Sequence, residues 1–160
     1  MSKLLDKILS RENMLEFYNQ VKSNKGSAGI DGITIEEMDD YLRHNWRLTK
    51  ELIKQRKYKP QPVLRVEIPK PNGGIRQLGI PTVMDRMIQQ AIVQVISPIC
   101  EPHFSDTSYG FRPNRSCEKA IMKLLEYLND GYEWIVDIDL EKFFDTVPQD
   151  RLMSLVHNII

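Results

Sequence analysis

Residues 62–81 have the sequence PVLRVEIPKPNGGIRQLGIP. The first half alternates apolar and charged side chains, which is the period of a β-strand with one apolar face. The turn sequence Pro71–Gly74 separates it from a second short apolar run, and this arrangement favours a β-hairpin. We therefore expect a hairpin from about Val63 to Ile80, with Lys70 and Arg76 on either side of its tip.

Apolar residues recur at helical spacing on both sides of this hairpin. The stretch 23–31 (SNKGSAGID) is a loop by composition, and Thr34 with Glu37 forms a capping box after it. We expect helices at about 4–9, 14–21, 41–55, 83–97, 116–131 and 148–159; Pro98 limits the fourth, and Ser116 caps the fifth. A buried strand at 134–136 completes the expected elements.

Charge is distributed unevenly along the chain. The 160 residues carry 22 basic and 22 acidic side chains, a formal net charge of +0. The segment Arg43–Arg86 holds eleven basic and three acidic residues, a balance of +8, so the remaining residues sum to −8. Such a chain can present a cationic surface in one place and bind cations in another.

Several classes of protein are excluded. Cys100 and Cys117 belong to no metal-binding pattern, and two cysteines make no disulfide framework, so we expect buried free thiols in a reducing compartment. No apolar run approaches the roughly 18 residues of a membrane span, and the first residues lack the apolar core of a signal peptide. These features predict a cytoplasmic protein with no membrane partner.

The strongest chemical signal is Asp137-Ile138-Asp139-Leu140-Glu141, at the end of the expected strand. Side chains two apart on a strand share a face, so Asp137 and Asp139 would form a hard oxygen site suited to Mg²⁺. Alone, a DxD string is more typical of solvated carboxylates. Two aromatic residues follow, Phe143 and Phe144, and each could pack in the core or on the sugar of a bound nucleotide; for Phe143 we expect the core.

Five short motifs follow one another along the chain. They are Gly26–Gly32 (GSAGIDG), Ile68–Pro71 with Arg76–Pro81 (IPKP and RQLGIP), Asp85-Arg86 with Gln89–Ala91, Tyr109–Ser116 (YGFRPNRS), and Val136–Asp139 with Phe143–Asp145. Each alone would be weak. In this order and spacing they resemble the N-terminal part of group II intron-encoded reverse transcriptases, also called maturases, over essentially the whole chain.

The resemblance implies an α+β fold: the fingers and the beginning of the palm of a right-hand polymerase, helix-rich, with a β-hairpin and a short antiparallel palm sheet. By this resemblance we expect N-terminal helices and an RNA-contacting loop over residues 1–35, fingers over 36–130, and the start of the palm over 131–160.

The resemblance also implies roles for single residues. Asp139 matches the first catalytic aspartate and metal ligand, and Phe144 matches the position that rejects a 2′-hydroxyl. Lys70 and Arg76 match cations that hold the incoming triphosphate. Nucleotide or template contacts are further implied for Ile80, Pro81 and Arg112, and RNA contacts for Arg115, Gly26 and Gly29.

The family's second metal-binding motif, an aromatic-Ala-Asp-Asp turn, does not occur in these 160 residues. The chain also ends in two apolar residues, Ile159 and Ile160. We therefore expect a fragment of an RNA-directed DNA polymerase that uses Mg²⁺. By itself we expect the fragment to be inactive, and its exposed apolar surface could pair two copies as a homodimer.

A basic stretch lies before the hairpin, and few acidic residues lie one helical turn away to offset its charge. This favours binding to RNA phosphates over a merely solvated face. Trp46 and Tyr58 could stack on RNA bases, or they could pack in the core. The cations of the stretch that we expect to bind RNA are Lys54, Arg56, Lys57 and Lys59.

Two functions compete. The first is RNA-templated DNA synthesis by the parent protein, with an RNA template, a DNA primer and dNTPs as partners, in support of intron mobility. The second is a module that binds group II intron RNA for splicing without polymerase activity of its own. A DxD sugar transferase would leave the hairpin cations and the YGFRPNRS loop unexplained, so we rank it low.

Overall fold

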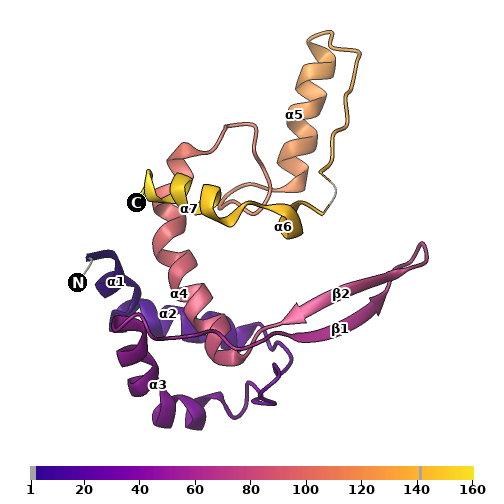
Figure 1. The fold of residues 1–160 in the computed structure, drawn as a ribbon. Coiled ribbons are helices and arrows are strands. Elements are labelled where there is room, and N and C mark those ends of the chain that lie inside the picture. Colours follow the sequence, from indigo (N-terminus) through magenta and orange to yellow (C-terminus); the bar gives the residue numbers. More distant parts are fainter. Residues whose placement is uncertain (1–2, 141) are drawn as a thin grey trace. The chain divides into compact units, whose positions relative to one another are not determined.

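A computed structural model describes residues 3–140 and 142–160, so Glu141 of the acidic motif lies outside the described residues. The chain forms two compact units, Met1–Ile96 and Ser97–Ile160. The predicted boundaries at residues 35 and 130 stay a prediction. Figure 1 shows the elements in chain order: α1 (Lys3–Ile8), α2 (Arg11–Ser23), α3 (Met38–Lys54), β1 (Leu64–Pro69), β2 (Ile75–Ile80), α4 (Val83–Cys100), η1 (Glu101–His103), α5 (Cys117–Asn129), α6 (Phe143–Thr146) and α7 (Gln149–His157).

The first unit contains the hydrophobic core. Residues three or four positions apart lie on one face of a helix, and such faces of α1, α2, α3 and α4 meet in this core. Trp46 of α3 packs against Phe17 of α2, with ring centroids 6.2 Å apart. The largest fully buried side chains are Phe17, Met38, Met87, Val83 and Thr82.

Local capping sets where α2 and α3 begin. The Ser10 hydroxyl accepts a hydrogen bond from the Asn13 N–H at the start of α2. The predicted capping box forms as well: the Thr34 hydroxyl accepts from the Glu37 N–H at 3.3 Å, and the Glu37 carboxylate accepts from the Thr34 N–H at 3.0 Å. The bonds from Thr34 lower the pKa of Glu37. Glu37, the last residue of this box, directly precedes Met38, the first residue of α3.

The predicted hairpin is confirmed. β1 and β2 pair antiparallel, from Leu64 opposite Ile80 to Pro69 opposite Ile75. At the tip the Lys70 N–H donates to the Gly74 carbonyl at 3.0 Å. Both glycines of the turn have positive φ, +82° at Gly73 and +88° at Gly74, a backbone conformation that residues with a Cβ rarely adopt. The turn sequence is therefore the direct cause of the reversal.

The second unit departs from expectation at Pro98. We expected this proline to limit the preceding helix, but α4 continues to Cys100 and leads into the 3₁₀ turn η1. Proline removes one backbone donor, and so close to the helix end this costs a single hydrogen bond. Farther on, Ser116 caps α5 as predicted, its hydroxyl accepting from the Lys119 N–H at 3.3 Å.

The expected buried strand at 134–136 is wrong. Within the described residues this segment is irregular, and Trp134 is 94% exposed. A strand requires a partner backbone for its hydrogen bonds, and β1 and β2 are the strands that pair in the part of the chain described. The expected palm sheet is thus not formed here, although the helix-rich α+β class with an antiparallel pair is confirmed.

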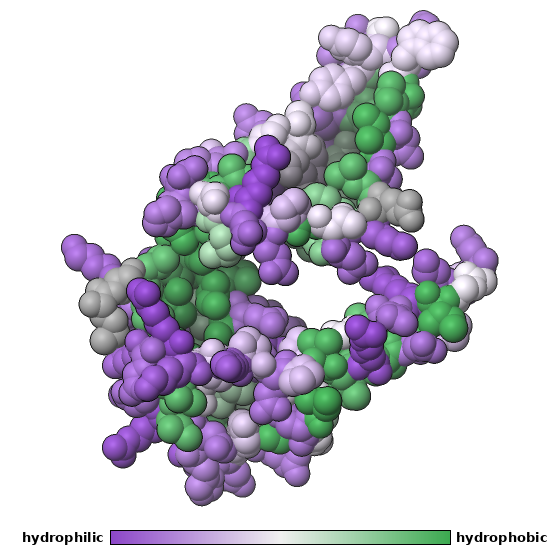
Figure 2. Space-filling view, viewed as in Figure 1, coloured by the Kyte–Doolittle hydropathy of each residue, from purple (hydrophilic) through white to green (hydrophobic). Residues whose placement is uncertain are grey.

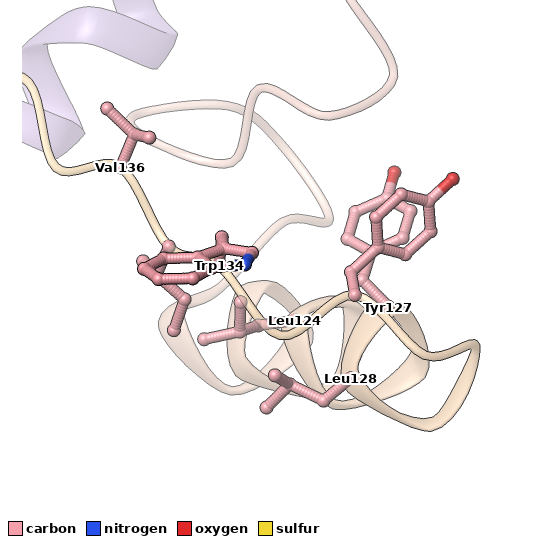
Figure 3. Close-up of a pocket in the computed structure, with 7 residues that line it drawn as sticks. Leu124, Tyr127, Leu128, Trp134 and Val136 are labelled. Carbon is pink, nitrogen blue, oxygen red and sulfur yellow. The ribbon is translucent and has the colours of Figure 1, made fainter.

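Residues 134–136 instead line a hollow of about 450 Å³ with side chains of α5, and Trp134 lies beside Leu124 (Figure 3). The apolar stripe of α5 is largely exposed, and Figure 2 shows green surface along this helix. The cysteines also differ from expectation, since Cys117 at the start of α5 is exposed and Cys100 is half-buried.

No helix in residues 3–140 or 142–160 combines the length and the apolarity needed to cross a bilayer.

Candidate nucleotide and RNA site

Asp139 and Phe144 line one shallow hollow of about 520 Å³ in the second unit. One carboxylate oxygen of Asp139 accepts the N–H of Leu140 at 2.9 Å, and the side chain is exposed. Phe144 is 91% exposed and meets Phe143 edge to face, with ring centroids 5.5 Å apart. Phe143 is itself about half exposed, so its predicted place in the core is wrong.

The carboxylates of this hollow suit a hard cation. Asp139 and Asp145 both line it, whereas Asp137 does not. Carboxylate oxygens are the ligands that Mg²⁺ prefers, so the donor chemistry fits part of a magnesium site. In the described residues no three His, Cys, Asp or Glu side chains cluster as a complete metal site would require.

Lys70 and Arg76 occupy the predicted place near the hairpin tip. Both are exposed, and Arg76 lies opposite Ile68 in the register. Neither forms an ion pair within the described part of the chain. Ile80 and Pro81 are half-buried at the base of the hairpin, four residues or more from Arg76 along β2. The strand therefore places Arg76 roughly 13 Å from Ile80, and Lys70, nearer the tip, lies farther still from the predicted templating-base contacts.

Asp85, at the start of α4, is a structural residue that the sequence analysis missed. It is 3% exposed, and its carboxylate accepts hydrogen bonds from the Tyr58 hydroxyl at 2.6 Å, the Thr82 hydroxyl at 2.7 Å and the Gln61 N–H at 3.0 Å. The Thr82 hydroxyl in turn accepts the Asp85 N–H at 3.1 Å. The reciprocal Thr-x-x-Asp spacing after Pro81 could have identified this cap.

The Asp85 network attaches the segment before β1 to the start of α4. Burial, together with the bond to Asp85, raises the pKa of Tyr58 above its ordinary value. Tyr58 thus has the packing role that was one of its two predicted alternatives; Trp46 packs against Phe17, and its stacking on RNA stays a prediction. Both ends of the hairpin are held at one place, because β2 leads directly into α4.

The loop 23–31 also packs on the start of α4. Gly29 is buried, and a Cβ there would lie 2.7 Å from the Thr82 Cα and 2.9 Å from the Pro81 carbonyl carbon. The guanidinium of Arg86 donates to the Ser27 carbonyl at 2.8 Å and lies against Gly26. Burial lowers the pKa of Arg86. Close packing explains both glycines, and their RNA contacts stay a prediction.

Arg112 points into its own loop. Its side chain is 7% exposed and donates to Glu101 at 2.8 and 3.0 Å and to the Ser108 carbonyl at 3.0 Å. Arg115 donates to the Asp106 carbonyl and lies over the Tyr109 ring. In this structure both arginines order the YGFRPNRS loop, and their nucleotide and RNA contacts stay predictions.

The predicted basic patch lies where α3 ends. Lys54 is half-buried, and Arg56, Lys57 and Lys59 are exposed. None of the four forms an ion pair among the residues that the structure describes. Arg56 has a left-handed backbone, φ +59°, and its N–H bonds to the Ile53 carbonyl as the helix terminates. The local turn therefore places uncompensated cations at one surface.

Residues 68–160, which contain the hairpin tip, the YGFRPNRS loop and the Asp139 hollow, match the family described as reverse transcriptase (RNA-dependent DNA polymerase). The chain belongs to the reverse transcriptase family. The resemblance found in its motifs is confirmed, and a sugar transferase is excluded.

Relatives of this reverse transcriptase chain include group II intron proteins. Protein YkfC of Escherichia coli is 36% identical over 99% of the chain, and the group II intron-encoded protein LtrA of Lactococcus lactis is 37% identical over 88%. A putative COX1/OXI3 intron 2 protein of Saccharomyces cerevisiae is 36% identical over 96%. The chain spans 43%, 23% and 18% of these three proteins, respectively.

A solved structure supports the fold of this reverse transcriptase chain. A partial Cas6-RT-Cas1–Cas2 complex matches 95% of the chain with a TM-score of 0.56 at 20% identity, and the match covers 24% of the other chain. At this identity the likeness concerns the fold alone.

Proposed function

We propose that the chain supplies the fingers and the beginning of the palm of an RNA-directed DNA polymerase that also serves as a group II intron maturase. The observation that carries the proposal is the shared hollow of Asp139 and Phe144, in the region that the family matches. The names of the relatives support the intron assignment.

In this proposal, residues at two places contribute to nucleotidyl transfer: the Asp139 hollow and the tip of the hairpin. Asp139 would hold a divalent cation, and Mg²⁺ bound there would supply charge neutralisation to the reacting phosphates. Lys70 and Arg76 bind the triphosphate of the incoming dNTP. Both cations are exposed and have no ion pair in residues 3–140 and 142–160, so they can neutralise the negative charge of the triphosphate. The Phe144 ring packs on the sugar, where a 2′-hydroxyl would collide with it. Template RNA and DNA primer are the remaining partners.

These 160 residues contain one of the two metal-binding motifs of such an enzyme. We therefore infer that they do not extend a primer by themselves. A reducing, cytoplasmic setting rests on the two unpaired cysteines. The predicted homodimer rests on the exposed apolar residues of α7, among them Leu152 and Leu155, and sedimentation of the purified chain can measure it.

Mn²⁺, a paramagnetic substitute for Mg²⁺, tests the metal role of Asp139 in the 160-residue chain. We expect added Mn²⁺ to broaden the amide resonances of Leu140 and Phe144, and Asp139→Asn to abolish this broadening. Asp137→Asn is the matched control, because Asp137 is also an exposed carboxylate of the motif but does not line the hollow. Equal broadening in the wild type and Asp139→Asn would refute the assignment.

A second candidate function is RNA binding without polymerisation. The observation that favours it is the patch of Lys54, Arg56, Lys57 and Lys59, which lacks ion pairs in the described structure. Cations without internal partners can neutralise phosphates and release counterions. The patch lies wholly within the first unit and does not depend on the Asp139 hollow.

A further inference from the structure

A third hollow, of about 450 Å³, opens between α2 and α3 in the first unit. Its floor is apolar, two aromatic side chains line it, and three cations line it as well. This volume lies within the range of small-ligand sites in proteins, about 300–1,000 Å³. The lining residues are Arg11, Met14, Leu15, Tyr18, Leu42, Arg43, Trp46, Lys50 and Met87.

The walls of this hollow are held in place by their own contacts. Trp46 packs on the buried Phe17, and Lys50 donates to the Leu9 carbonyl at 3.0 Å. The Tyr18 hydroxyl donates to Asp39, which also pairs with Lys22 at 3.1 Å. The bonds from Tyr18 and Lys22 lower the pKa of Asp39. The hollow is thus built before any ligand arrives, which reduces the entropy lost on binding.

A stripe of cations runs along α3 beside the hollow. Arg43, Arg47, Lys50 and Lys54 are spaced by four, three and four residues, so they lie on one face of the helix. At 1.5 Å per residue the stripe is about 16 Å long. Within the described residues, the one ion pair of this stripe joins Arg43 to Asp40 at 3.6 Å, and both partners are exposed. Such a pair contributes little and leaves Arg43 available to a phosphate.

An aromatic, apolar floor beside a row of cations matches the chemistry of a nucleotide. A base stacks on aromatic rings, and phosphates pair with Arg and Lys. An acidic amphipathic peptide would also meet an apolar floor and a cationic rim, but the stripe continues past the hollow to Lys54, next to the other cations of the basic patch. A backbone with regularly repeated charge fits that extension better.

We propose that an unpaired RNA nucleotide inserts its base into this hollow while the neighbouring phosphates lie along the α3 stripe toward the basic patch. This inference rests on the proposed RNA binding and adds to it a site that holds a base. Trp46 and Tyr18 form the stacking surface, and Leu15, 57% exposed on α2, closes one side.

Trp46 reports directly on this site. The chain has two tryptophans, so the Trp134→Phe background leaves Trp46 as the fluorophore. We expect a short single-stranded RNA to quench Trp46 and an abasic oligonucleotide of the same length to bind without quenching. Quenching by an acidic amphipathic peptide but not by RNA would overturn the proposal.

Two variants with the same charge change measure the contribution of the hollow. Leu15→Asp places a carboxylate in it, and we expect RNA affinity to fall about fivefold or more, since stacking of one base accounts for about fivefold to more than a hundredfold. Leu48→Asp is the control, because Leu48 is similarly exposed at 63% on α3 but does not line the hollow. Leu48→Asp should lower RNA affinity by no more than about threefold, because it changes only the charge near the cations of α3.

The outcomes separate this inference from the proposed function. The base site is refuted if RNA binds the wild type with a steep salt dependence but does not quench Trp46, and if Leu15→Asp and Leu48→Asp lower RNA affinity equally. That result would leave RNA binding by the basic patch intact. No RNA binding by the wild-type chain refutes the proposed RNA binding, and the base site with it.

Discussion

Replacement of Gly29 by Ala tests whether the loop 23–31 is shaped by packing on α4. Gly29 has no positive φ, so Ala can adopt its backbone conformation. The added Cβ would nevertheless lie 2.7 Å from the Thr82 Cα and 2.8 Å from the Thr82 nitrogen, where ordinary contact begins at 3.4 Å. Main-chain atoms cannot rotate away, so the loop must move by about 0.7 Å.

The expected cost follows from this displacement. Overpacking of a well-packed site costs about 1–3 kcal/mol, and the reduced freedom of the unfolded chain offsets about 0.4–1 kcal/mol of it. We expect Gly29→Ala to lower the free energy of unfolding by about 1–2 kcal/mol. For a unit the size of Met1–Ile96, each kcal/mol lowers the melting temperature by about 4–8 °C.

Thermal unfolding followed by Trp46 fluorescence measures this change, in the Trp134→Phe background. Gly110→Ala is the control, because nothing lies within 4 Å of its Cβ and its φ is not positive; since it lies in the second unit, circular dichroism follows the melting of both variants. Gly26→Ala should fall between them, since its Cβ meets the flexible end of Arg86. A Gly29→Ala protein that melts with the wild type, while RNA affinity falls, would refute the packing argument in favour of a direct RNA contact.

Two further predictions concern the basic patch and Asp85. Charge reversal of Lys54, Arg56 and Lys57 to Glu should weaken RNA binding and reduce the slope of log affinity against log salt by about 2, because three phosphate contacts are lost. The control is the same reversal at three exposed cations elsewhere, Lys3, Lys7 and Arg151, which should leave the slope nearly unchanged. Equal slopes for the two triple variants would contradict RNA binding by the basic patch. Tyr58→Phe removes a hydrogen bond to a buried carboxylate and should lower the free energy of unfolding by about 2 kcal/mol at neutral pH. The raised pKa of Tyr58 means that its stabilisation is present below the ordinary tyrosine pKa, about 10, and is lost as pH rises above it, so the wild type should lose more stability than Tyr58→Phe in alkaline denaturation. Equal losses of stability with rising pH in the wild type and in Tyr58→Phe would contradict this role of Tyr58.

Features determined by neighbouring residues were predictable from the sequence. Alternation and the Asn-Gly-Gly turn predicted the hairpin, and the spacing of Thr34 and Glu37 predicted the capping box. The motif resemblance pointed to the reverse transcriptase family, and the family match confirmed it. Each of these signals lies within a few residues of the feature it predicts, because turns and caps are formed by local hydrogen bonds.

Other features depend on residues that are distant in the chain. Tyr58 and Asp85 are 27 positions apart, and Ser27 and Arg86 are 59 positions apart, so no local sequence pattern predicts the hydrogen bond within either pair. The inward turn of Arg112 follows from Glu101 on the preceding 3₁₀ turn. The exposure of Trp134 has the same origin, because an apolar segment becomes a buried strand when a partner backbone pairs with it. The sequence by itself determined the hairpin, the caps at Thr34 and Ser116, and the family. The tertiary structure decided which charged groups are consumed by packing and which remain free for a ligand, since burial and pairing depend on all the segments that meet at a site.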